Sequence, residues 1–204
     1  MAPLVAGLLF FKYLNKESRI IFLLVIIATV PQVLTAFIAQ AVFLNTLYNI
    51  YTPVEFVMIY LLFGRQISYR LFKSIRMVSV VVFLGVSVPV VIIAGIGNRF
   101  LNEWVCAANL CYVCWIFLFI LQGLLDNVEI LDSGSPMFWY LAGLIFYAPA
   151  TALVFSFYYS IGKNSLIKDD LWVIHDIFNT FMYIFFAAGM YKNYRNGVRL
   201  KRRA

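Results

Sequence analysis

The chain has 204 residues, of which 64% are hydrophobic and 12% are charged. A soluble globular domain is about half apolar and about one quarter charged, so this composition excludes such a domain and predicts an all-α membrane protein. The net charge of +7 would suggest nucleic-acid binding in a soluble protein. Here the basic residues flank apolar segments, so we expect them to contact anionic lipid headgroups, with no nucleic-acid partner.

Seven apolar segments predict a single transmembrane bundle over residues 1–192, because a spanning helix needs about 20 apolar residues. The expected helices cover residues 3–14, 20–44, 53–68, 77–97, 104–125, 136–161 and 171–191, and residues 193–204 form a basic cytoplasmic tail. The first segment is short. We expect it to span, with Lys12 reaching the interface, and the alternative is a helix that lies in the interface.

Two of these helices carry sequence signals for their first residues. Thr52, Pro53 and Glu55 match the N-cap, N1 and N3 positions of a capping box, which predicts that the third helix begins at Pro53. Ser135 and Pro136 match the N-cap and N1 positions of the sixth helix in the same way.

The distribution of lysine and arginine predicts the orientation of the bundle. The loops 12–19, 65–76 and 192–203 hold 13 of the 16 basic residues, and the other side has only Arg99, Lys163 and Lys168. Under the positive-inside rule, the C-terminus lies inside and the N-terminus outside, if the first segment spans.

The positions of prolines and carboxylates suggest two parallel three-helix repeats joined by the fourth helix. Pro31 and Pro149 lie near the centres of the second and sixth helices, and Glu55 and Asp176 follow on the third and seventh. Repeats of this kind place a binding site between them. The alternative is a chance pairing of prolines, which are common in membrane helices.

The seventh helix carries the most unusual polar group of the chain. His175, the only histidine, lies within one turn of Asp176 and Asn179 in an otherwise apolar segment. Ionisable groups inside a span are expensive and mark binding sites by default. We expect them to meet other polar or kinking residues in a cavity in the outer half of the bundle; the predicted ligand-binding residues are Glu55, His175, Asp176, Asn179, Pro31 and Gln32.

Each of these residues also has a purely structural interpretation. Glu55 could only cap its helix, Asp176 could complement a helix N-terminus, and His175 could bond across helices as an anchor.

Several catalytic classes lack their signatures. The sequence has no P-loop, no HExxH and no G-x-S-x-G motif, and one histidine is too few for a conventional multi-histidine metal site. Cys106, Cys111 and Cys114 share one apolar segment and are best explained by packing. We therefore predict no cofactor, no metal, no catalytic residue and no enzymatic activity; the enzymatic alternative is a membrane hydrolase or lipid-modifying enzyme that uses His175 and Asp176.

The stretch LYNIYTPVEF over residues 47–56, with a last helix that carries Trp172, His175 and Asn179, resembles a group of small bacterial seven-helix membrane proteins of unassigned function. The resemblance implies a seven-helix plan and a bacterial inner membrane. Pro31-Gln32 is also similar to the pair in PQ-loop and sugar-transporter-like proteins, although the corresponding pair in the second half is Pro149-Ala150.

The sequence therefore leads to one main hypothesis and two alternatives. The main hypothesis is a small-solute carrier with a polar site in the outer half of the bundle. The first alternative is a sensor that couples an outside ligand to a cytoplasmic signalling protein, and the second is a non-catalytic subunit of a membrane assembly.

Overall fold

Helices dominate the structure because, in lipid, an α-helix satisfies all of its own backbone hydrogen bonds. The computed structural model describes residues 2–37, 40–63, 66–94, 97, 100–126, 132–160 and 165–203. In these residues there is no strand, and the helices are α1 (Ala2–Phe10), a 3-10 turn (Phe11–Tyr13), α2 (Lys16–Phe37), α3 (Ala41–Phe63), α4 (Arg70–Ala94), α5 (Asn102–Leu125), α6 (Pro136–Ser160) and α7 (Ser165–Arg203). The expected all-α class is confirmed.

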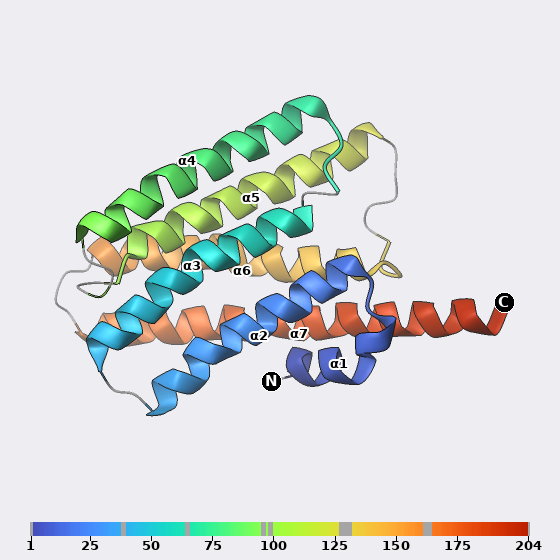
Figure 1. The fold of residues 1–204 in the computed structure, drawn as a ribbon, viewed down its shortest axis with the longest axis horizontal. Helices are drawn as coiled ribbons and strands as arrows, with labels where there is room; N and C mark the ends of the chain where they lie inside the picture. Colours follow the sequence, from blue (N-terminus) through green and yellow to red (C-terminus); the bar gives the residue numbers. More distant parts are fainter. Residues whose placement is uncertain are drawn as a thin grey trace.

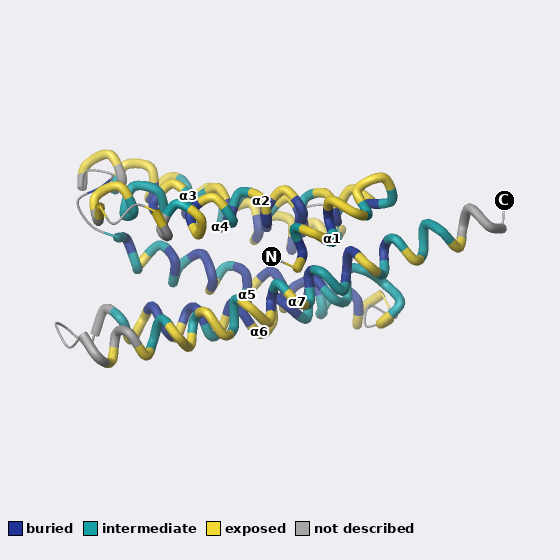
Figure 2. Tube along the Cα trace, turned by 90° about the horizontal axis from the view of Figure 1, so that it is seen from below, coloured by how far each residue is buried: buried dark blue, intermediate teal, exposed yellow. Residues whose placement is uncertain are grey.

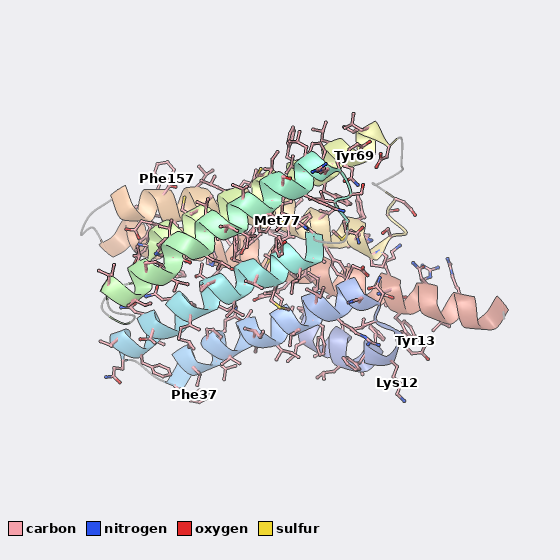
Figure 3. The ribbon with its side chains drawn as sticks, turned by 45° about the horizontal axis from the view of Figure 1, so that its top comes forward. Lys12, Tyr13, Phe37, Tyr69, Met77 and Phe157 are labelled. Carbon is pink, nitrogen blue, oxygen red and sulfur yellow. The ribbon has the colours of Figure 1, made fainter. Side chains whose placement is uncertain are left out.

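The long helices pack in two layers, with α2, α3 and α4 in one layer and α5, α6 and α7 in the other (Figure 2). They run antiparallel in chain order, so that α2, α4 and α6 begin at the end from which α7 emerges (Figure 1). Lys12, Tyr13 and Tyr69 lie at that end, and Phe37 and Phe157 lie at the opposite one (Figure 3). We call these the basic end and the far end.

Six helices, α2 to α7, are long and apolar enough to cross a membrane, which is the architecture of a polytopic membrane protein. Residues 3–14 fall in a shorter apolar helix, Ala2–Tyr13, in which the nine residues of α1 span about 13.5 Å at 1.5 Å per residue before the 3-10 turn. The predicted crossing by this segment stays a prediction. α1 runs beside the basic half of α7, and the N-terminus stops part-way along the bundle instead of reaching the far end (Figure 1).

The third helix begins twelve residues before the predicted start at Pro53. α3 starts at Ala41 and contains Pro53 in its interior, so the capping-box interpretation of Thr52 and Glu55 is wrong. The Thr52 hydroxyl instead donates to the Tyr48 carbonyl one turn back, at 3.1 Å, which is a common role for threonine inside a helix. The preceding residues are apolar and aromatic enough to extend the span, and proline is tolerated there.

The predicted basic loop 65–76 is partly helical. Arg65 lies outside the described residues, while α4 begins at Arg70 and carries Lys73 and Arg76. Arg76 is 5% exposed, and its guanidinium carbon lies 4.5 Å from the centre of the Tyr60 ring. A cation–π contact of this kind offsets part of the cost of burying the charge.

Two predictions about the last helices have different outcomes. α6 begins at Pro136 as predicted, and the Ser135 hydroxyl accepts from the Met137 N–H at 3.3 Å. α7, predicted over 171–191 with a separate tail, continues to Arg203 and projects beyond the bundle (Figure 2). Tyr194 stacks on Phe10 with ring centres 4.5 Å apart, so the segment after Tyr191 has a packing partner that keeps it helical.

The two glycines on the seam between α6 and α7 let these helices approach closely. A Cβ at Gly189 would lie 2.3 Å from the Tyr140 ring, and one at Gly143 would lie 3.2 Å from the Met182 carbonyl oxygen. Small residues at such contacts are how membrane helices gain packing energy. The repeat relation between the halves of the chain stays a prediction; Pro31 and Pro149 do both lie inside their helices.

Candidate functional site

A polar cavity opens between α2, α3, α6 and α7 in the half of the bundle nearer the far end. Its volume is about 90 Å³, enough for several water molecules or a solute of a few heavy atoms. The residues that line it are Ala28, Pro31 and Gln32 from α2, Tyr48 and Tyr51 from α3, Tyr147 from α6, and Trp172, His175, Asp176, Asn179 and Tyr183 from α7.

The structure brings together five of the six predicted ligand-binding residues. Pro31 and Gln32 face His175, Asp176 and Asn179 across this cavity, although some 140 residues separate the two groups in the sequence. Glu55, the sixth, does not line the cavity. Pro149, which the repeat hypothesis pairs with Pro31, is exposed on α6 and does not line it either.

Glu55 lies directly behind the cavity wall. It is 4% exposed, and its Oε1 accepts a hydrogen bond from the Tyr51 hydroxyl at 3.0 Å. The two residues are one helical turn apart on α3, and Tyr51 itself lines the cavity. The carboxyl group thus holds a phenol of the wall in place.

His175 is held in an aromatic surround between α6 and α7. Its Nδ1 lies 3.4 Å from the Thr151 hydroxyl, and its ring centre lies 5.3 to 5.8 Å from those of Phe155, Trp172 and Tyr147. Thr151 is fully buried, so the histidine is fixed on its α6 side and open on its cavity side. This geometry can orient an imidazole nitrogen toward a bound solute.

A hydrogen-bonded pair joins α2 to α7 across the cavity. The Gln32 amide donates to the Tyr183 hydroxyl at 3.3 Å, and Asn179 lines the cavity one turn from Tyr183. The contact is long for a hydrogen bond, so it ties the two helices weakly. A solute with its own donors and acceptors could replace it.

Two larger clefts lie along α4, but their chemistry is different. They measure about 230 and 680 Å³ and share Phe83 and Trp104. The aliphatic side chains of α4 that line them, such as Val82, Val86 and Ile92, form the exposed flank of the bundle. The smaller cleft is also lined by five residues of α3, among them the buried Asn49 and Thr52. In a bilayer, lipid chains contact such a flank, so size alone does not make these clefts the candidate site.

The predicted ligand-binding residues do not include the tyrosines that complete the cavity wall. Tyr147 and Tyr183 line it together with Tyr51, in a chain of 13 tyrosines. Tyrosine is common in membrane-interface belts, which hides those few that serve a site. A usable signal existed in Tyr51 and Glu55, whose spacing of four residues places them on one helix face, but the capping-box interpretation obscured it.

Within the described residues, no group of three His, Cys, Asp or Glu side chains is arranged to hold a metal ion. Comparisons with protein-family models, curated proteins and solved structures find no match to this chain. The polar cavity is therefore the feature of this protein that bears on its function.

Proposed function

We propose that the protein is a small-solute carrier of the cell membrane, in bacteria the inner membrane, with its binding site in the cavity between α2, α3, α6 and α7. The observation that carries the proposal is that four helices contribute polar groups to one small cavity within a bundle whose surface is apolar. Polar residues inside a span that face a shared cavity are typical of substrate pathways.

The position of the cavity fits the outward-facing state of an alternating-access cycle. Toward the basic end, three of the helices that line the cavity carry buried apolar side chains, among them Leu24 on α2, Leu144 on α6 and Phe186 on α7. We assign the basic end to the cytoplasm by the positive-inside rule, where its lysines and arginines meet anionic headgroups. The cavity then belongs to the outer half of the bundle.

Pro31 supplies a point at which α2 can bend to open and close this site. Its ring lines the cavity, and a proline inside a helix removes one backbone hydrogen bond. Rocking of helices around a central site is how many carriers work.

The carrier is tested by flux in proteoliposomes that hold the full-length protein. A panel of labelled solutes of up to about six heavy atoms, namely methylammonium, acetamide, acetate and glycine, is assayed for saturable uptake and counterflow. We expect at least one solute to show counterflow, and Asp176→Asn to reduce it at least tenfold. Asp126→Asn, an exposed carboxylate at the basic end, is the matched control and should leave flux unchanged.

A sensor is the second candidate, and one observation favours it. α7 supplies five of the lining residues and then continues without interruption to Arg203, beyond the basic end (Figures 1 and 2). Such a rod could carry a ligand-induced shift to a cytoplasmic signalling protein. Saturable binding of a panel solute without any flux would identify the protein as a sensor instead of a carrier. If no panel solute shows binding or flux, the assembly subunit is the function that is left.

A further inference from the structure

The charge of the cavity is opposite to that of the whole protein. The chain carries a net charge of +7, yet the described residues that line the cavity include the carboxylate of Asp176 and no lysine or arginine. A second carboxyl group, that of Glu55, lies directly behind Tyr51. Asp176 is exposed and lines the cavity, so its charge is accessible to a cation there.

The remaining wall is largely aromatic. Tyr48, Tyr51, Tyr147, Trp172 and Tyr183 all line the cavity, and aromatic rings attract cations through the negative potential of their faces. The Tyr51 hydroxyl donates its hydrogen bond to Glu55, so its oxygen can accept a hydrogen bond from a donor in the cavity. Aromatic rings that surround a site with one or two carboxylates are typical of sites for ammonium groups.

The volume of the cavity and the chemistry of its wall further restrict the class of solute that it can bind. An apolar cavity of about 150 Å³ holds benzene, so about 90 Å³ limits the solute to a few heavy atoms. A Ca²⁺ or Mg²⁺ ion prefers carboxylate and carbonyl oxygens, whereas four of the eight side-chain oxygens of this wall are phenol hydroxyls and Asp176 is its one carboxylate. An ammonium group needs only a counter-charge, a few acceptors and ring faces.

We propose that the solute is a small ammonium cation, either a primary amine in its charged form or a methylated ammonium, held by Asp176 and the aromatic wall. The proposal rests on the cavity being the solute site of the proposed function, and it names the class of that solute. Glu55 acts through Tyr51 as a positioning residue.

Calorimetric titration of the full-length protein in detergent, at fixed ionic strength, tests the inference. The probes are methylammonium and tetramethylammonium chloride, with acetamide as the neutral comparator and acetate as the anionic one. We expect saturable binding of at least one ammonium probe, at concentrations where neither comparator binds. Binding of acetamide or acetate as tight as that of the ammonium probes, or no ammonium binding at all, would overturn the proposal.

Substitutions of Asp176 and Trp172 test separately whether the carboxylate charge and the aromatic wall bind the cation. Asp176→Asn should weaken ammonium binding at least tenfold, and Asp176→Glu should restore part of it, which also shows that the site still folds. The affinity should fall in the order wild type, Trp172→Phe, Trp172→Leu, because tryptophan binds cations best and leucine not at all. Asp126→Asn and Trp139→Phe alter the same residue types at the basic end and should change nothing.

The two proposals can fail separately. Flux of acetamide or acetate without ammonium binding would support the proposed carrier and contradict the proposal that its solute is an ammonium cation. Ammonium binding without flux would support the ammonium ligand and favour a sensor over a carrier.

Discussion

The two halves of the bundle use polar residues in opposite ways. Near the basic end, the buried Ser18 hydroxyl accepts from the Tyr140 hydroxyl at 2.5 Å and bonds the Asn193 amide at 2.6 Å. The other end of that amide donates to the Tyr13 carbonyl at 2.9 Å. Gln122 in the same half accepts from the Ser68 N–H at 2.6 Å and donates to the Gln66 carbonyl at 3.0 Å.

Near the far end, two long polar contacts border an open volume. The His175–Thr151 and Gln32–Tyr183 contacts are 3.4 and 3.3 Å long, and the cavity of about 90 Å³ lies between them. Short, saturated bonds hold helices together, whereas long bonds around a cavity leave capacity for a ligand. The partners of a polar residue in a membrane helix thus indicate whether it holds helices together or binds a ligand. The residue type alone does not distinguish these two roles.

The largest expected effect is at the seam of the basic half. Gly189→Ala places a Cβ 2.3 Å from the Tyr140 ring and displaces the hydroxyl that Ser18 binds. We expect a loss of about 2–3 kcal/mol in unfolding free energy, in the upper range for overpacking, measured by denaturant titration in detergent micelles. Gly85→Ala, where no atom lies within 4 Å, is the control; it should be neutral or stabilising by up to about 1 kcal/mol. Equal losses in both variants would show that the seam is not tight.

A smaller effect is expected from the hydrogen-bond network itself. Ser18→Ala leaves the Tyr140 hydroxyl buried without a partner and should lower the unfolding free energy by about 1–2 kcal/mol. Ser74→Ala, whose exposed hydroxyl bonds only the Arg70 carbonyl of its own helix, should change it by less than about 0.5 kcal/mol. If Ser18→Ala were as mild as Ser74→Ala, the basic half would not depend on this network.

Much of this fold was predictable because strong signals mark many helix ends. Ser135-Pro136 fixes the start of α6, and α5 covers 102–125 where 104–125 was expected. The boundary between α2 and α3 was not predictable, since α2 ends at Phe37 inside an apolar run without glycine, proline or charge. Pro53 misled because a local capping pattern cannot reveal that the preceding turns are also helical.

The site was predictable in part for a similar reason. His175 and Asp176 stand out because ionisable groups are rare in an apolar helix, and the one-turn spacing to Asn179 places all three near one another. The partners on α2 and α3 come from tertiary packing, which no local pattern specifies. For that reason Glu55 was placed on the cavity wall by expectation, whereas the structure puts Tyr51 in front of it.

The far half should tolerate a substitution that removes its function. Gln32→Leu removes the 3.3 Å bond to Tyr183 and makes the wall apolar. We expect a change of no more than about 0.6 kcal/mol in unfolding free energy, the average for a hydrogen bond between membrane helices, together with at least tenfold weaker solute binding. A large loss of stability with unchanged binding would place Gln32 among the structural residues and remove the contrast between the halves.

The smallest effect is expected at the edge of the basic end, outside the spans. The Tyr69 hydroxyl donates to Asp126 Oδ1 at 2.8 Å, and this bond raises the pKa of Tyr69 above its ordinary value of 10. Because the folded pKa is raised, the stabilisation is complete below pH 10 and is lost as the pH rises through the higher folded pKa. Asp126→Asn should bring the pKa back toward 10, followed by NMR of ring-labelled tyrosine, with Tyr69→Phe to identify the resonance. An unchanged titration in Asp126→Asn would mean that the bond does not persist in solution, and the polar contacts of the basic half would then be firm only where they are buried.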